Sequence, residues 1–179
     1  MTFPSSPGLL AAIDFESAGA ERGRTDEPVQ IGIATLDANG SVEVERLLRS
    51  YLACDQQIVW SARKVHGITD EDIADAPSLV SLWPEISSRL RGIPVVAHGA
   101  GTEKRFLRAF PLHGFGPWID TLTLAREALP QLPDHSLATV TGALGLEGEL
   151  RDNLPDLDWH DALFDALAAL LVARELKVF

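Results

Sequence analysis

The sequence has 179 residues, a length typical of one domain, so we expect residues 1–179 to fold as a single domain. Hydrophobic residues make up 46% and charged residues 23% of the chain, which excludes extended disorder, a coiled coil and collagen. The net charge of −11 argues against a protein that wraps a nucleic-acid duplex, but leaves open a locally held polyanion or carboxylates gathered around metal ions.

A single cysteine, Cys54, can form no internal disulfide, and this is typical of a reducing compartment. The N-terminal residues lack the basic region of a signal peptide. The longest uncharged apolar runs are far shorter than the roughly 20 residues that span a bilayer. We therefore expect a cytoplasmic protein with no membrane partner.

The first half of the chain carries mainly strand patterns. Residues 9–13 form a continuous apolar run, which predicts a buried strand. The charged residues 21–27 predict a loop. Residues 29–36 and 42–45 then flank the turn sequence Ala-Asn-Gly at 38–40, and this arrangement predicts a β-hairpin.

The second half carries mainly helix patterns. The spacing of apolar residues predicts a helix over 78–91, and residues 94–97 predict a short buried strand. Further helices are predicted at residues 103–110, 121–129, 136–144 and 161–175. We expect Asp120 to cap the helix that follows it, and Trp60 to be buried. Hairpin strands followed by alternating strands and helices predict an α/β fold, with a mixed sheet flanked by helices.

Two acids stand at the end of the first predicted strand. Asp14 and Glu16 are two residues apart, so their side chains project from one face and Phe15 projects from the other. A functional pair of carboxylates is one interpretation. The alternative is a loop that begins with two solvated acids.

Another acid interrupts the last predicted helix. Every residue from 162 to 173 is apolar except Asp165, and a lone carboxylate on such a helix is costly to bury without partners. The alternative is an exposed face of small alanines. His160 lies five residues earlier, about 140° away on an ideal helix, so it can meet Asp165 only from the entrance of the helix. A purely structural histidine is the competing interpretation.

Three motifs in this chain resemble those of the DEDDh branch of the proofreading-type 3′–5′ exonucleases (the ribonuclease T superfamily). Residues 12–19 (AIDFESAG) resemble the first motif, residues 95–107 (VVAHGAGTEKRFL) the second, and residues 160–166 (HDALFDA) the third. Softer similarities occur in the family's order at residues 65–69, 119–122 and 135–137. Together they cover nearly the whole chain.

The resemblance implies a ribonuclease-H-like fold, with a mixed five-stranded sheet flanked by helices. It also implies two Mg²⁺ (or Mn²⁺) ions held by four acids, with His160 as the general base that takes a proton from the attacking water. The four implied metal ligands are Asp14, Glu16, Glu103 and Asp165. The implied reaction releases nucleoside 5′-monophosphates from the 3′ end of single-stranded DNA or RNA.

The resemblance further implies a set of substrate contacts. Phe15 and Ser17 belong to the first motif, and His66 and Ile68 resemble residues that contact the terminal nucleotide in relatives. The competing interpretation of the second pair is a loop followed by a short helix, because residues 69–72 (TDED) resemble a capping box. Both interpretations can hold together.

The second motif departs from the family pattern at its acid. Glu103 stands where the family has Asp, and one extra methylene moves the carboxylate oxygens by about 1 Å, which can alter a rate a hundredfold. We expect Glu103 to be a ligand; the alternative is a surface acid beside Lys104. Gly99 and Thr102 replace the usual Asn and Phe, so base contacts are expected to differ.

These departures motivate two further hypotheses. One is a catalytically degenerate protein of the exonuclease fold that binds nucleic acid or a polymerase partner. The other is a phosphodiesterase of short oligonucleotides. The resemblance also leaves a homodimer open, and the sequence does not select DNA over RNA. Acids concentrate in residues 146–165, whereas bases exceed acids in residues 89–108, so a short strand end remains compatible with the overall charge.

Overall fold

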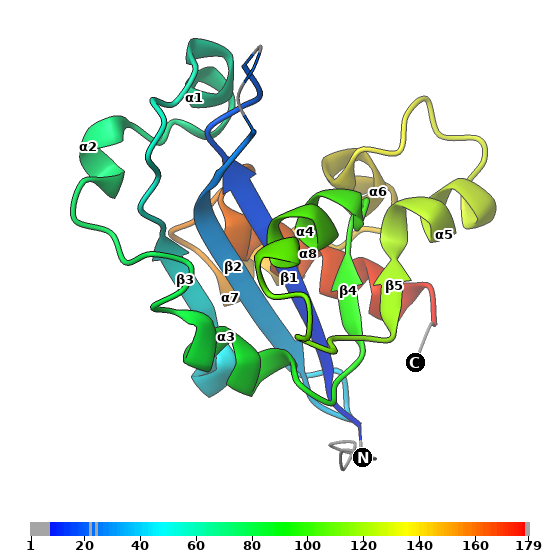
Figure 1. Ribbon diagram of the computed structural model, residues 1–179. Coiled ribbons are helices and arrows are strands. Elements are labelled where there is room, and N and C mark those ends of the chain that lie inside the picture. The colour runs from blue at the N-terminus through cyan, green and yellow to red at the C-terminus, as the bar shows by residue number, and fades with distance from the viewer. Residues whose placement is uncertain (1–7, 22, 24, 178–179) are drawn as a thin grey trace.

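A mixed five-stranded sheet forms the centre of the molecule (Figure 1). The computed structural model describes residues 8–21, 23 and 25–177. The strand order is β3-β2-β1-β4-β5, in which β1–β2 and β2–β3 are antiparallel and β1–β4 and β4–β5 are parallel. The strands are β1 (Leu10–Ser17), β2 (Pro28–Leu36), β3 (Leu48–Tyr51), β4 (Val95–Ala97) and β5 (Trp118–Asp120). The predicted mixed five-stranded sheet is therefore confirmed.

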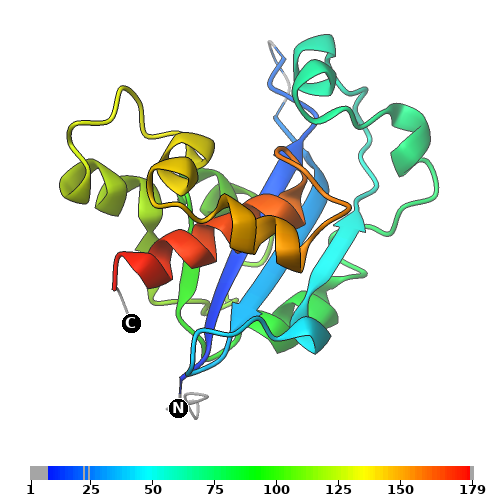
Figure 2. The ribbon, with the colours of Figure 1, turned by 180° about the vertical axis from the view of Figure 1, so that it is seen from behind.

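Helices cover both faces of the sheet. They are α1 (Trp60–His66), α2 (Asp70–Ile73), α3 (Trp83–Leu90), α4 (Gly101–Phe106), α5 (Thr121–Ala128), α6 (Leu137–Ala143), α7 (Glu147–Asn153) and α8 (Ala162–Glu175). Helix α8 crosses one face and lies in front of the sheet in Figure 2, whereas α3 and α4 lie on the opposite face (Figure 1). Within the described part of the chain, no helix combines the length and apolar character needed to cross a membrane.

The alternation of side chains along β1 divides the core in two. Leu10 and Ala12 pack on the face that α8 covers, while Ala11, Ile13 and Phe15 pack on the face that α3 covers. Even-numbered residues of β1 therefore point towards α8. Asp14 and Glu16 continue this even-numbered row.

Helix α8 is buried on all sides. Residues 162–173 are buried apart from Asp165, which is partly exposed. The helix lies between the sheet and the helices α6 and α7, so it needs no polar face. The alternative of an exposed alanine face is therefore wrong, and Asp165 is the exception in a buried helix.

Several predicted boundaries differ from the structure. The hairpin partner of β2 is β3 rather than residues 42–45, of which Val42 forms an isolated bridge and residues 44–46 a 3₁₀ helix. The side chain of Asp37 accepts hydrogen bonds from the backbone N–H groups of Asn39 and Ser41, which stabilise the turn. The next strand, β3, begins only at Leu48.

The predicted helix over 78–91 begins only at Trp83, because the preceding residues form turns. The predicted helix over 103–110 spans Gly101–Phe106 and continues as a 3₁₀ helix over Leu107–Ala109. Trp60 is 73% exposed rather than buried. It is the first residue of α1, a helix that the sequence pattern did not predict, and that helix contributes no buried residue to the core.

Candidate active site

The end of β1 places two carboxylates on the face that carries α8. Asp14 lies opposite Gly32 of β2, and Glu16 lies opposite Gln30. Residues directly opposite each other in an antiparallel pair share one face of the sheet. Asp14 and Glu16 therefore face the first turns of α8, and the alternative of a loop with solvated acids is wrong.

Gly32 lets the start of α8 approach the sheet. A Cβ atom at this position would collide with the backbone of Ala162 and Leu163, the first two residues of the helix. Only glycine permits backbone to approach a strand so closely. This contact seats the first turn of α8 beside Asp14, so that Asp165, one turn further along, comes to the same place.

A polar clamp fixes the direction of α8. The amide of Gln30 donates from Nε2 to Asp161 Oδ2 over 2.9 Å and accepts at Oε1 from the backbone N–H of Ala162, also over 2.9 Å. Arg49 Nε donates to the same Asp161 Oδ2 at 2.6 Å. Asp161 Oδ1 caps the helix by accepting from the N–H of Leu163. Asp161 is therefore the N-cap, with a side chain only 12% exposed.

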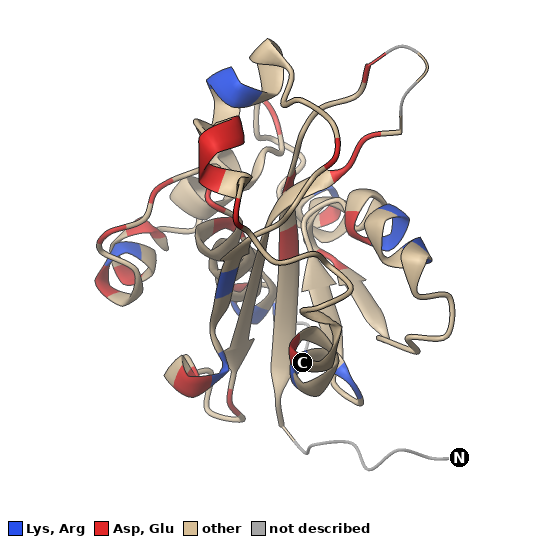
Figure 3. Ribbon diagram, turned by 60° about the vertical axis from the view of Figure 1, so that its left-hand side comes forward, with Lys and Arg blue, Asp and Glu red and all other residues tan. Residues whose placement is uncertain are grey.

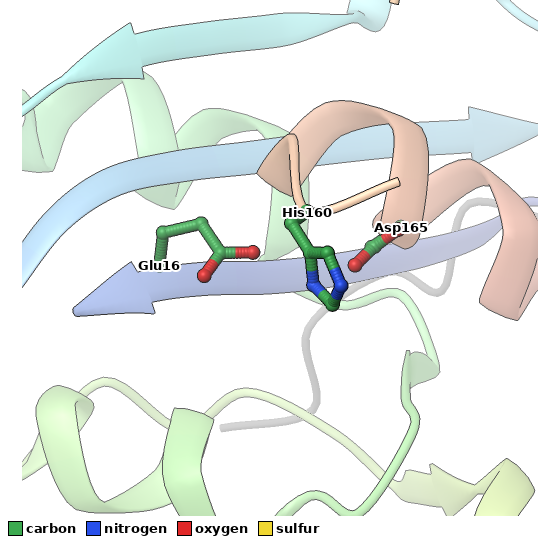
Figure 4. A group of neighbouring side chains, drawn as sticks. All are labelled: Glu16, His160 and Asp165. Carbon is green, nitrogen blue, oxygen red and sulfur yellow. The ribbon is translucent and has the colours of Figure 1, made fainter. Parts of the chain in front are cut away.

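His160 lies just outside the helix and has an unusual backbone conformation. Its φ angle is 67°, in the left-handed region that few residues other than glycine adopt. Because of this backbone turn, the exposed imidazole lies over the sheet. On a regular helix it would point about 140° away from Asp165. Ligand atoms of Glu16, His160 and Asp165 all lie within 4.8 Å of one another, and Figure 4 shows the imidazole between the two carboxylates.

The carboxylates in this cluster repel one another in a partly dry environment. Burial raises the pKa of Glu16 to about 8, and the charges of Asp165 and Asp161 add to the effect. Burial likewise raises the pKa of Asp165 to about 7, although a backbone hydrogen bond from His160 opposes the shift. Burial and the charge of Asp165 raise the pKa of Asp14 well above its usual value.

Glu103 is a further acid, on a helix that contacts β1, and it lies outside the group formed by Glu16, His160 and Asp165. It lies in α4, is only 4% exposed, and burial raises its pKa to about 7. Its charge contributes to the raised pKa of Asp14, so the two carboxylates are within electrostatic reach. The alternative of a surface acid beside Lys104 is wrong, because Glu103 is buried.

An ion pair ties α4 to the loop after β1. Arg105 Nη2 donates to Asp26 Oδ2 at 2.8 Å, and Asp26 Oδ1 accepts from the backbone N–H of Gly19. The side chain of Asp26 is 7% exposed and that of Arg105 is 38% exposed, so the carboxylate is shielded from water while the guanidinium still contacts it. It holds the helix that carries Glu103 against the segment that follows Glu16.

The donor set suits a divalent cation. Among the described residues, Glu103 Oε2 and Asp165 Oδ1 are buried and have no hydrogen-bond partner. Unpaired buried oxygens and mutually repelling carboxylates are both unfavourable unless protons or cations neutralise them. Oxygen ligands of this type are the ones that Mg²⁺ and Mn²⁺ prefer. The residues present therefore fit a hard divalent metal.

His66 links the end of β1 to the loop before α2. Its Nδ1 accepts from the backbone N–H of Ile68 and its Nε2 lies 3.0 Å from the carbonyl oxygen of Ser17, so the proton is on Nε2. Burial lowers the pKa of His66, and His160 lowers it further. The predicted capping box is also present, because Thr69 and Asp72 exchange side-chain to backbone hydrogen bonds at the start of α2.

A pocket of about 230 Å³ adjoins His160 on this side. Its lining includes Arg49, Tyr51, His66, Ile68 and Trp159. The structure does not bring Phe15 to this site: its side chain is 6% exposed and packs edge-on against Phe106 in the core of the opposite face, with ring centroids 5.4 Å apart.

Asp120 and His98 order the segment before α4. Asp120 Oδ1 accepts from the N–H groups of Gly99 and Leu122, which confirms Asp120 as the cap of α5. His98 Nδ1 lies 2.9 Å from Thr121 Oγ1, and its Nε2 lies 2.8 Å from the carbonyl oxygen of His135. Both side chains hold β4 and β5 in register at the end nearest the acids.

Four residues that hold the site in place did not emerge from the sequence. They are Gln30, Gly32, Arg49 and Asp161. A glycine inside a run of β-branched residues is a sign of close backbone approach, so Gly32 alone had a recognisable signal. The other three are ordinary polar residues whose partners are distant in the sequence.

The sequence model of the exonuclease family, described as RNase T exonuclease, matches residues 11–173, and the chain belongs to this family. The family defines the chain as a nuclease, an enzyme of the hydrolase class.

The curated relatives are much longer proteins. The chain is 31% identical over 162 residues to the PolC-type DNA polymerase III of Thermotoga maritima, a match that covers 88% of this chain and 11% of the polymerase. It is 28% identical over 163 residues to a DNA polymerase III subunit epsilon-like protein of Rhodobacter capsulatus, covering 89% and 22% of the two chains. The chain thus spans about a tenth to a fifth of these relatives.

Solved structures share the fold over nearly the whole chain. Exonuclease X, solved in complex with 5′ overhanging duplex DNA, superposes with a TM-score of 0.72 at 25% identity, covering 94% of this chain and 92% of that one. The nuclease domain of 3′hExo, a DEDDh family member bound to rAMP, gives 0.73 at 16% identity, with 97% and 94% covered. The expected ribonuclease-H-like fold is confirmed.

Proposed function

We propose that this chain is a metal-dependent 3′–5′ exonuclease that releases nucleoside 5′-monophosphates from single-stranded DNA or RNA ends. The observation that carries the proposal is the convergence of Glu16, His160 and Asp165 within 4.8 Å, on a surface that also holds Asp14. The exonuclease family to which the chain belongs supports the reaction class, and the 3′-exonucleases among its structural neighbours support the direction.

Four acids are the proposed metal ligands: Asp14, Glu16, Glu103 and Asp165. The proposed cofactor is a pair of Mg²⁺ (or Mn²⁺) ions, which would stabilise the attacking and the leaving oxygens of an in-line phosphodiester displacement. Burial raises the pKa of all four carboxyls, and repulsion from neighbouring carboxylates adds to the effect. A cation would remove that repulsion.

His160 is the proposed general base. Its imidazole is exposed to solvent, so an incoming water can reach it, and it stands between the carboxylates of Glu16 and Asp165 (Figure 4). In this role the ring would accept a proton from that water. The left-handed backbone conformation holds the ring in this place.

The terminal nucleotide is proposed to lie along the end of β1. Ser17, His66 and Ile68 meet there through the two hydrogen bonds of the His66 ring, next to the pocket beside His160. Both nitrogens of His66 are engaged by backbone, so its ring would contact a nucleotide through its face or carbon edge. Phe15 takes no part through its side chain, because that side chain lies in the opposite core.

The biological setting is also a proposal. The curated relatives are DNA polymerase III proteins and subunits, so we propose a polymerase partner; a homodimer is the other proposed assembly. A cytoplasmic location agrees with the single free cysteine, Cys54. A catalytically degenerate role is disfavoured, because the buried Glu103 supplies the acid of the second motif.

The test uses oligonucleotides labelled at either end. With Mg²⁺ or Mn²⁺, a 3′-labelled strand should yield labelled mononucleotide at once, and a 5′-labelled strand should yield a ladder of shortened products. EDTA should stop both reactions. Release of 5′-terminal mononucleotide first, or no hydrolysis of any strand, would refute the proposal.

The substitution Asp14→Asn should lower the rate by more than about a hundredfold, because it removes a charge from the centre of the cluster. It should not destabilise the metal-free protein, since asparagine is neutral where a carboxylate is costly to bury. Asp75→Asn is the matched control, because Asp75 is exposed. Equal rates for Asp14→Asn and wild type would remove Asp14 from the proposed ligands.

A further inference from the structure

Helix α1 is anchored across the end of the strand that carries Asp14 and Glu16. The ring of His66 at its last residue hydrogen-bonds to the carbonyl oxygen of Ser17, and the N–H of Val59, just before its first residue, donates to the carbonyl oxygen of Ala18 over 2.9 Å. A Cβ on Gly19 would collide with the side chain of Val59 and would lie 3.1 Å from Ala62 Cβ. The helix is therefore fixed to residues 17–19 at both ends.

The outer side of α1 presents an aromatic ring and two cations. Trp60 is 73% exposed, and Arg63 and Lys64 are exposed beside it. Lys64 Nζ lies 5.0 Å from the centroid of the Trp60 ring. This cation–π contact stabilises the position of the ring, and the ammonium group of Lys64 stays at the surface. Within residues 8–21, 23 and 25–177, neither cation forms an ion pair with a carboxylate. The exposed ring contributes nothing to the core and is free to contact a ligand.

The surroundings of this helix are acidic. Figure 3 shows the basic turn of α1 in blue at the top of the molecule and the acidic turn of α2 in red below it. Residues 70–72 are all acidic, and hydrogen bonds from Thr69, with a smaller contribution from the charge of Arg63, lower the pKa of Asp72. In a chain with a net charge of −11, the Arg63–Lys64 pair is thus a local exception beside the catalytic strand.

A hollow of about 370 Å³ lies against the same helix. It is lined by Gln57, Ile58, Val59, Trp60, Arg63 and Glu21. The lining offers a ring for stacking, a guanidinium for phosphate, and the amide of Gln57 and carboxylate of Glu21 for the polar edge of a base. Along the axis of a helix, Trp60 is about 9 Å from His66, a distance that one or two nucleotides of a single strand can bridge.

We propose that Trp60, Arg63 and Lys64 form a second nucleotide subsite, in which a base upstream of the 3′ end stacks on Trp60 while the two cations contact the neighbouring phosphates. This inference rests on the proposed function, since it assumes a single strand that enters at His66 and Asp165. It predicts a preference for strands long enough to reach α1. A dinucleotide would occupy the catalytic site alone.

The experiment compares an octanucleotide and a dinucleotide as substrates. Trp60→Ala should lower kcat/KM for the octanucleotide by about tenfold, in line with the loss of one stacked base, and leave the dinucleotide unaffected. Trp60→Phe, which keeps an aromatic ring, should retain most of the wild-type kcat/KM for the octanucleotide. Leu112→Ala is the matched control, because Leu112 is 95% exposed and belongs to a different surface.

Equilibrium binding separates this inference from the proposed function. The dissociation constant of a fluorescein-labelled octanucleotide, measured by anisotropy with Ca²⁺ in place of Mg²⁺, should rise about tenfold in Trp60→Ala even if the chain hydrolyses nothing. In Lys64→Gln the slope of log K against log salt should flatten by about 0.7, the value for one lost phosphate contact on a single strand.

Two results would overturn the inference. Equal octanucleotide affinity for Trp60→Ala and wild type would show that the exposed ring does not bind the strand. An equal loss with the dinucleotide and the octanucleotide would mean that Trp60 supports the catalytic site and does not contact the upstream strand. A failure of hydrolysis in the wild-type protein, with length-dependent binding intact, would refute the proposed function and leave the subsite standing.

Discussion

Replacing Glu103 with Gln tests whether a buried, uncompensated charge exists in the second motif. Burial raises the pKa of this carboxyl from 4.5 to about 7, so its ionisation in the folded, metal-free protein costs about 3 kcal/mol. The folded state binds the proton of Glu103 more tightly than the unfolded state does. The contribution of this proton to the free energy of unfolding is therefore fully present below pH 4.5 and is lost as the pH rises through 7. Glu103→Gln carries no ionisable group at this position, so the variant does not lose stability there as the pH rises.

The assay is urea unfolding in EDTA between pH 4 and pH 9. The free energy of unfolding of Glu103→Gln minus that of wild type should rise by about 3 kcal/mol across this range, with the urea m value unchanged. Added Mg²⁺ should reverse the order at pH 8, because wild type has one more acid to bind the ion. The exposed acid Glu127 supplies the control, and Glu127→Gln should show no such trend. A difference that stays constant with pH would refute the buried charge.

Two further predictions concern the seating of α8 and its entrance. Gly32→Ala should destabilise the fold by about 3 kcal/mol, because its Cβ would collide with the backbone of Ala162 and Leu163. The control Gly148→Ala, in open space within α7, should be neutral or stabilising. Similar unfolding midpoints for the two variants would contradict this packing. His160→Gly should raise the free energy of unfolding by about 1 kcal/mol, since it relieves a left-handed backbone, yet lower kcat by about 10²–10⁴-fold. A parallel loss of stability and activity would show that the histidine serves the fold alone.

Local patterns predicted much of the secondary structure. The alternation along residues 10–17 placed Asp14 and Glu16 on one face, and the structure has them there because side chains along a strand alternate between the two faces of the sheet. The apolar helix with one acid was also predicted, as α8 with Asp165. Strands β3 and β5, of four and three residues, were missed, because so short a segment carries too little periodicity to identify.

The sequence by itself determined the acids, their spacing and the apolar character of the elements that carry them. Only the tertiary structure decided that these acids meet. Gln30 and Asp161 are 131 residues apart, and their hydrogen bond together with the close approach at Gly32 sets where α8 crosses the sheet. Propensity and periodicity act over a few neighbouring residues, whereas such contacts form only when the sheet and helix pack. That packing brings His160 and Asp165 together.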